Sequence, residues 1–197
     1  MTDGFDRRDV VRRLLADRGT MLVVSGLGSP AWDITAAGDD PLNFPLWGAM
    51  GGAVPIGLGL ALAQPGRRVL VVTGDGEMLM GIGSLATVAI REPRNLAIAV
   101  LDNARYGETG GQASHTAGRA EGGAGVDLAA IARGAGIDAA LNVGANGDLD
   151  AAVASLRNAP GPVFATIRIR PGTAPLVLPP RDGATLKDRF RAALGVA

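Results

Sequence analysis

Two oxygen-bearing side chains follow two apolar runs of the sequence. Asp75 stands between two glycines after the run 68–73, and Asn103 follows Asp102 after the run 95–101. Carboxylate and amide oxygens suit a hard cation such as Mg²⁺, which takes a near-octahedral set of oxygens. If both runs are parallel strands, their carboxyl ends meet at the edge of the sheet where α/β proteins bind ligands. A magnesium site at Asp75 and Asn103 is therefore the first hypothesis.

The rest of the sequence alternates helix-like and strand-like segments. Helical spacing or small-residue composition predicts helices over 5–18, 50–64, 79–91, 126–134, 148–157 and 183–194. Apolar runs predict strands over 20–24, 68–73, 95–101, 138–143 and 163–169. These runs are apolar throughout, which is typical of a parallel sheet covered by helices on both faces. We therefore predict an α/β fold: a three-layer αβα sandwich with a mostly parallel sheet.

The segments between these elements are predicted to be irregular. Residues 26–47 are interrupted by Gly, Pro and Asp and show no clear period, and residues 104–125 are Gly-rich and polar. Both segments follow predicted strands, so both are predicted loops at the ligand-binding edge. No boundary divides the chain, so 1–197 is expected to be one domain with a Pro-rich C-terminal extension over 171–197. The arginine pairs at 7–8, 12–13 and 67–68 are expected to be solvated.

Composition excludes several classes of function. The formal net charge is zero, which gives no basic excess for nucleic acid. The absence of Cys excludes disulfides and thiol catalysis, and a single His cannot form a His-rich zinc site. The longest apolar run, 53–63, is shorter than the roughly 20 residues of a membrane span. We expect a soluble cytoplasmic protein that binds neither nucleic acid nor membrane.

The two strand-end motifs together resemble a known cofactor site. Gly74-Asp75-Gly76, followed after about 25 residues by Asp102-Asn103, resembles the GDG…NN diphosphate-binding motif of thiamine-diphosphate enzymes. Asp102 departs from the first Asn of that motif, but the family's metal ligand is the second Asn, here Asn103. The resemblance implies thiamine diphosphate and Mg²⁺ as cofactors, with Asp75, Asn103 and the carbonyl of Arg105 as metal ligands. It also implies cofactor contacts for Gly74, Gly76, Glu77, Tyr106 and Gly107.

A third segment resembles the same family. Residues 47–51, Trp-Gly-Ala-Met-Gly, are similar to its G-x-[large apolar]-G segment. The resemblance implies that Met50 supports the bent cofactor and that the Gly48 carbonyl accepts a hydrogen bond from its 4'-amino group. This bend lets the cofactor remove its own proton, so the protein supplies mainly orientation and electrostatics. An ordinary core position at a helix start is the alternative for Met50.

The resemblance covers only half of a complete enzyme. Such enzymes combine a PP domain, which binds diphosphate and metal, with a PYR domain, which holds the aminopyrimidine. This chain resembles the PP domain over about 5–170 and leaves no room for a PYR domain. The resemblance therefore implies a separate PYR-domain (α) subunit, an assembly of at least α2β2, and no activity for this chain alone. Residues 85–87 and 106–112 are similar to the sulfopyruvate and phosphonopyruvate decarboxylases, which implies a small anionic 2-oxo acid as substrate.

The polar loop 104–118 supplies the candidate catalytic residues. Glu108 lies where related decarboxylases place a Glu that transfers a proton, and a closed site raises the pKa of such an acid. His115 is the only His and is a candidate donor to a sulfonate or phosphonate, or a proton relay. A solvated Glu and a structural His are the alternatives. Further candidate anion donors are Thr109, Gln112, Ser114 and Thr116.

Three other functions remain open. A split carboligase of the acetolactate synthase type would join the decarboxylated fragment to a second carbonyl. A non-catalytic cofactor-binding subunit is disfavoured by the intact Asp75, Asn103, Met50 and Glu108. An unrelated nucleotide binder is disfavoured because Pro30 interrupts the only Gly-rich loop after the first strand.

Overall fold

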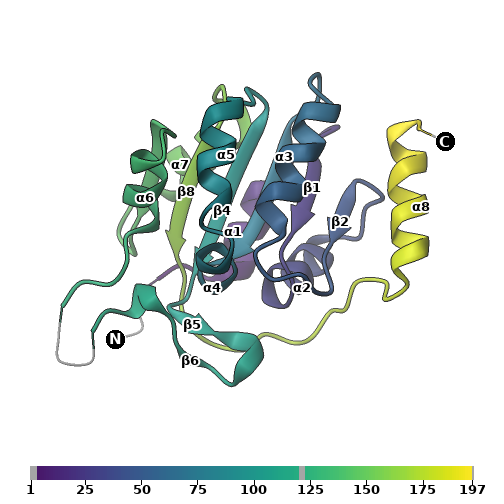
Figure 1. Cartoon of the computed structure of the whole chain (residues 1–197). Helices are drawn as coiled ribbons and strands as arrows, with labels where there is room; N and C mark the ends of the chain where they lie inside the picture. Colours follow the sequence, from purple (N-terminus) through teal and green to yellow (C-terminus); the bar gives the residue numbers. More distant parts are fainter. Residues whose placement is uncertain (1–3, 120–122, 197) are drawn as a thin grey trace.

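The computed structural model describes residues 4–119 and 123–196. A six-stranded sheet forms its centre, and every pair of neighbouring strands is parallel (Figure 1). This pairing confirms the predicted parallel sheet, and its strands are mostly apolar, as expected. The strand order is β2 (Asn43–Pro45), β1 (Leu22–Ser25), β3 (Val69–Gly74), β4 (Leu96–Asp102), β8 (Val163–Arg168) and β7 (Ala139–Val143).

Helices cover both faces of the sheet, which confirms the three-layer sandwich. One face carries α3 (Ala53–Ala63), α5 (Ser84–Arg91) and α6 (Leu128–Gly134), and the other carries α1 (Arg7–Leu15), α2 (Ser29–Ala37) and α7 (Leu149–Asn158) (Figure 1). Successive side chains of a strand point to opposite faces. Val71 therefore packs into the core under α3 and α5, whereas Leu70 and Val72 pack into the core under α1 and α7.

The large buried side chain of β8 gives a test of this core. Phe164 has no exposed surface and lies in the core under α3, α5 and α6. Phe164→Ala is expected to lower the free energy of unfolding by about 3–5 kcal/mol, because it leaves a cavity. Chemical denaturation measures this change. Ile90→Ala, at a side chain that is 84% exposed on α5, is the control and should change stability by less than about 0.5 kcal/mol. Equal effects of the two substitutions would contradict the assigned core.

Segment 26–47 is not the loop that its Gly and Pro content predicted. It contains α2 and the short edge strand β2. Pro30 lies in the first turn of α2, where its missing N–H costs no hydrogen bond. Pro45 lies on an edge strand, where proline is tolerated. The prediction was wrong because these two residues were read as breakers.

The predicted helix over 79–91 covers the end of one helix and the whole of the next. Helix α4 (Asp75–Met80) begins directly at the end of β3, and α5 begins at Ser84. Between them Gly81 packs against the backbone of Gly51: a Cβ on Gly81 would lie 2.4 Å from the Gly51 carbonyl oxygen. Only glycine permits this approach, so a tertiary contact separates α4 from α5.

The predicted loop 104–118 folds as a small hairpin. β5 (Arg105–Tyr106) pairs antiparallel with β6 (Gln112–Ala113), and the 3₁₀ turn η1 (Gly107–Thr109) lies between them. A second 3₁₀ turn, η2 (His115–Ala117), follows. The rest of the predicted loop reaches 125, and its residues 120–122 lie outside the described residues.

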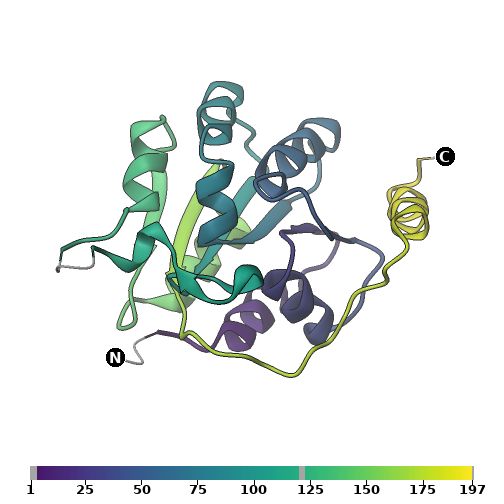
Figure 2. The same ribbon diagram turned by 60° about the horizontal axis from the view of Figure 1, so that its bottom comes forward.

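The C-terminal extension leads to an additional helix. The extended chain after β8 runs past α1 and α2 to α8 (Gly183–Leu194) (Figure 2). Phe190 of α8 packs against Phe44 of β2 with ring centroids 5.2 Å apart. The indole N–H of Trp47 donates to the Pro180 carbonyl at 2.8 Å. Helix α8 therefore covers the edge strand β2. No helix among residues 4–119 and 123–196 is long and apolar enough to span a membrane.

Candidate functional site

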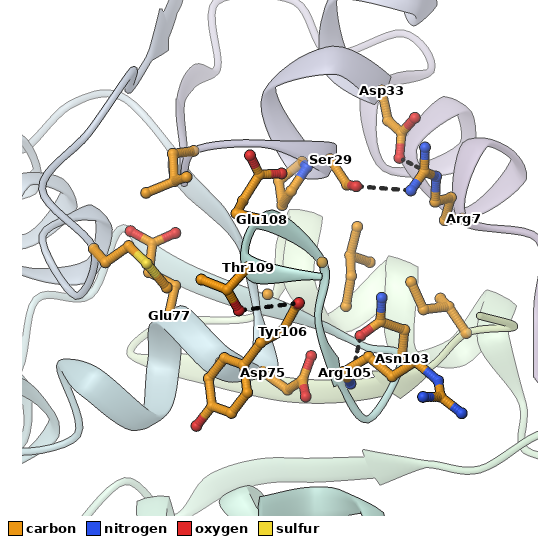
Figure 3. A pocket seen from close by; sticks show the side chains of 18 residues that line it. Arg7, Ser29, Asp33, Asp75, Glu77, Asn103, Arg105, Tyr106, Glu108 and Thr109 are labelled. Carbon is orange, nitrogen blue, oxygen red and sulfur yellow. Dashed lines mark hydrogen bonds and ion pairs between the residues drawn. The ribbon is translucent and has the colours of Figure 1, made fainter. Parts of the chain in front are cut away.

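A pocket opens where β1, β3 and β4 end (Figure 3). The register pairs Gly74 with Leu101, so β3 and β4 leave the sheet side by side. This arrangement brings most of the sequence-predicted site residues into one lining. The predicted residues in the lining are Met50, Gly74, Asp75, Gly76, Glu77, Asn103, Arg105, Tyr106, Gly107, Glu108 and Thr109. The predicted residues outside it are Gly48, Gln112, Ser114, His115 and Thr116.

Asp75 is almost fully buried at the start of α4. Its Oδ2 accepts a short hydrogen bond from the Ser114 hydroxyl, and the Thr116 hydroxyl lies 3.2 Å away. Burial is the main cause that raises the pKa of Asp75; the hydrogen bond from Ser114 opposes it, and the nearby Asp102 adds to it. A cation beside a buried carboxylate offsets the cost of burying its negative charge.

Asp102, where the family motif has Asn, belongs to the same polar network. Its Oδ1 accepts hydrogen bonds from the Thr116 hydroxyl at 2.7 Å and from the Ala104 N–H at 2.9 Å. Its Oδ2 forms an ion pair of 3.3 Å with Arg168. Thr116 thus connects the carboxylates of Asp75 and Asp102, and Arg168 pairs with the carboxylate that stands where the family motif has Asn.

Asn103 and Arg105 form the turn that leads from β4 into the hairpin. Asn103 is half-buried, and its Oδ1 accepts the Arg105 N–H at 2.9 Å. The Arg105 guanidinium turns toward the hairpin and donates to the Gly111 carbonyl at 2.9 Å. An amide oxygen has a second lone pair, so Asn103 retains an acceptor site for a metal. Among the described residues, no group of three or more His, Cys, Asp or Glu side chains is placed to hold a metal ion. A metal bound beside Asp75 would therefore need amide or carbonyl oxygens as further ligands.

Glu77 accepts hydrogen bonds from several segments of the pocket wall. Its Oε2 accepts the Thr73 hydroxyl at 2.9 Å, and its Oε1 accepts the Ala53 N–H at the start of α3. Burial raises the pKa of Glu77, while these donors and the backbone N–H groups of Gly51 and Leu27 oppose the rise. Donors from three chain segments, at Leu27, at residues 51–53 and at Thr73, therefore meet on one carboxyl group and fix the position of the pocket wall.

The hairpin lies over the pocket and carries Glu108, and His115 lies in the turn η2 that follows it. The Tyr106 ring covers Gly76 so closely that a Cβ there would lie 2.6 Å from the ring. The Tyr106 hydroxyl lies 3.1 Å from Nδ1 of His115, which is itself exposed. Glu108 is exposed, lines the pocket and contacts Gly28. Glu108 can thus reach a bound molecule directly, whereas His115 contacts the lining through Tyr106.

Sequence reasoning missed a buried ion pair in the pocket wall. The Arg7 side chain was expected to be solvated, but it is about nine-tenths buried. Its Nε lies 3.0 Å from Oδ2 of Asp33, and its Nη1 donates to the Ser29 hydroxyl at 2.8 Å (Figure 3). Ser29 and Asp33 fell in the predicted loop. The signal for Arg7 was present: it lies on the apolar face of its helix, in line with Val10, Val11 and Leu14.

Arg68 also departs from the expectation of a solvated pair. It is half-buried and donates to the carbonyls of Leu156 at 2.9 Å and Ala159 at 2.8 Å. These carbonyls lie at the C-terminal end of α7, where the helix leaves acceptors unpaired. Arg12 and Arg13 are exposed, as expected.

Comparisons with known proteins identify the family to which the chain is similar. The family model described as "Thiamine pyrophosphate enzyme, C-terminal TPP binding domain" matches residues 33–167. The β subunit of sulfopyruvate decarboxylase from Methanothermobacter thermautotrophicus is 35% identical over 94% of this chain and 93% of its own length. Phosphonopyruvate decarboxylase from Streptomyces hygroscopicus is 39% identical over 92% of this chain, which spans 44% of that protein.

The fold has a counterpart among solved structures. A protein from Mycobacterium smegmatis, described as a thiamin diphosphate-dependent enzyme, superposes with a TM-score of 0.70. It is 23% identical, and the match covers 86% of this chain and 32% of that chain. This likeness supports the fold alone. With the family model and the two relatives, we conclude that the chain belongs to the thiamine pyrophosphate enzymes, as a C-terminal TPP-binding domain.

Proposed function

We propose that this chain is the cofactor-binding subunit of a thiamine-diphosphate-dependent 2-oxo acid decarboxylase. The substrate is sulfopyruvate or phosphonopyruvate, and the products are the aldehyde and CO₂. The proposal is carried by one pocket that joins Asp75 and Asn103 at neighbouring strand ends to Glu108 on the hairpin above them. Relatives with sulfopyruvate and phosphonopyruvate in their names support the substrate class.

The charge of the pocket supports a divalent cation. Four carboxyl side chains line it against two guanidinium groups. Diphosphate would add further negative charge, so a divalent cation is needed to bind it there. Asp75, Asn103 and the Arg105 carbonyl are the ligands we propose for Mg²⁺. The four carboxyl side chains are Asp33, Asp75, Glu77 and Glu108, and the two guanidinium groups are Arg7 and Arg105.

The residues of this chain have distinct roles in the proposed reaction. Thiamine diphosphate, when bound, supplies the electron sink for the loss of CO₂. Met50, which lines the pocket, would support the cofactor, and Tyr106, whose ring covers Gly76 of α4, would exclude water there. Glu108, which lines the pocket, would deliver the proton that replaces the lost carboxylate on the reacting carbon. His115 steadies the Tyr106 hydroxyl and is the second proton-transfer candidate.

We propose a separate PYR-domain subunit and an assembly of at least α2β2. The chain has nearly the length of a relative named as a β subunit, and it spans less than half of phosphonopyruvate decarboxylase. The purified chain alone is therefore expected to release no CO₂ from sulfopyruvate, phosphonopyruvate or pyruvate with magnesium and thiamine diphosphate. Adding a PYR-domain chain should restore release for an anionic substrate, measured as CO₂ and aldehyde.

The same assay tests the alternatives. Decarboxylation by this chain alone would contradict the split architecture. A product longer than the aldehyde would indicate a carboligase instead. No CO₂ from any of these acids, with cofactor bound in the assembled complex, would indicate a non-catalytic subunit.

A further inference from the structure

The Arg7–Asp33–Arg8 cluster lies in the pocket wall and has no role in the proposed reaction. Asp33 is fully buried between two guanidinium groups: Arg7 Nε lies 3.0 Å from Oδ2, and Arg8 Nε lies 3.1 Å from Oδ1. The two arginines differ in what else they face. Arg7 and Asp33 line the pocket, whereas Arg8 is outside the lining and also donates to the Pro175 carbonyl.

The cluster carries one surplus positive charge. One carboxylate faces two guanidinium groups, and the neighbouring Asp6 does not change this balance. Asp6 caps α1 by accepting the Arg8 and Asp9 N–H groups, and it faces Arg170 at 3.8 Å. A buried charge without a counterion is costly. The Arg7 side chain is only 10% exposed and lines the pocket, so an anion bound in the pocket would compensate this charge.

We propose that Arg7 and Ser29 bind phosphate oxygens of the cofactor's diphosphate, from the pocket wall opposite Asp75 and Asn103. Figure 3 shows these two pairs on opposite sides of the pocket. A guanidinium group presents donors in a planar fork that matches a phosphate. The Ser29 hydroxyl accepts from Arg7 at 2.8 Å, so its own proton is free to donate to the same anion.

The position of Arg7 favours the diphosphate, rather than the anionic tail of the substrate, as the anion that it binds. Arg7 shares its pocket with the residues proposed to hold the magnesium ion, which would attract the phosphate groups rather than the substrate to this end of the pocket. The substrate instead reacts at the other end of the cofactor, where we place the PYR-domain partner. This inference rests on the proposed function, because it requires thiamine diphosphate in this pocket.

Calorimetric titration of the full chain with inorganic diphosphate and magnesium tests the assignment. Arg7→Gln is expected to weaken binding about 10- to 100-fold, the effect of losing charge-assisted hydrogen bonds. Ser29→Ala should weaken binding about threefold to tenfold. Arg8→Gln is the matched control, since it removes an ion pair to the same Asp33 from outside the pocket lining. It should change affinity by less than about threefold.

Each outcome decides for or against Arg7. Unchanged binding by Arg7→Gln, or an equal loss for Arg8→Gln, would overturn the inference and leave the cofactor site standing. If Arg7→Gln does not fold, Arg7→Lys keeps the charge but loses the fork, and binding as tight as wild type would overturn the inference. Failure of the wild-type chain to bind magnesium diphosphate would instead overturn the proposed cofactor site, and this inference with it.

The assembled enzyme separates the two sources of anion. Arg7→Gln should weaken the binding of thiamine diphosphate. At saturating cofactor it should leave the KM for the 2-oxo acid unchanged. A raised KM with unchanged cofactor affinity would overturn the diphosphate assignment in favour of the substrate's tail.

Discussion

Asp75→Asn is expected to lower the affinity for thiamine diphosphate and magnesium at least about 100-fold. The substitution removes a charged ligand from the proposed metal site, and even residues that only support metal ligands contribute about 10- to 100-fold. Asn keeps the size of the side chain, so the hydrogen bond from Ser114 can persist. Calorimetry or fluorescence quenching in the assembled complex measures the loss, with magnesium varied.

The matched control for this prediction is Asp102→Asn. It removes one negative charge from the same hydrogen-bonded network and restores the Asn of the family motif. We expect its cofactor affinity to stay within about tenfold of wild type, because its Arg168 ion pair is partly exposed and therefore contributes little. Equal losses for the two variants would show that total charge matters and would refute Asp75 as the ligand. Thermal melting of both proteins checks that they fold.

Glu108→Gln is expected to lower kcat about 10²- to 10⁴-fold, the usual contribution of a general acid or base. The Gln side chain keeps the shape of Glu108 but cannot transfer the proton. Cofactor affinity should stay within about threefold, since Glu108 is not among the proposed metal ligands. Steady-state kinetics of the assembled complex, with cofactor binding measured in parallel, separates the two effects.

Glu92→Gln makes the same chemical change at the exposed end of α5 and should leave kcat unchanged. A loss in kcat below about tenfold for Glu108→Gln would remove Glu108 from proton transfer. Loss of cofactor binding together with kcat would assign it a binding role instead.

The sequence was informative where the signal was local. β3 and β4 are continuous apolar runs, and each was predicted within a residue or two of its observed bounds. Asp75 and Asn103 follow these strands directly, so parallel pairing alone brings them to one edge. The family resemblance was carried by the same two motifs, and the family model confirms it.

The wall opposite those motifs could not be predicted, because it depends on contacts between distant residues. Arg7 and Asp33 are far apart in the sequence, on different helices. Only the packing of α1 against α2 brings their charged groups together. The end of α4 likewise depends on Gly51, far from Gly81 in sequence.

The amino-acid sequence by itself determined the parallel sheet, the family and the position of Asp75 and Asn103 at neighbouring strand ends. Each of these depends on residue order within short segments. The tertiary structure decided that Arg7 is buried, that Tyr106 covers Gly76, and that Glu108 faces the pocket while His115 remains outside its lining. The physical reason is that burial and charge compensation depend on neighbours in space. Local periodicity predicts which face of an element is apolar, but it does not identify the group that will lie against it.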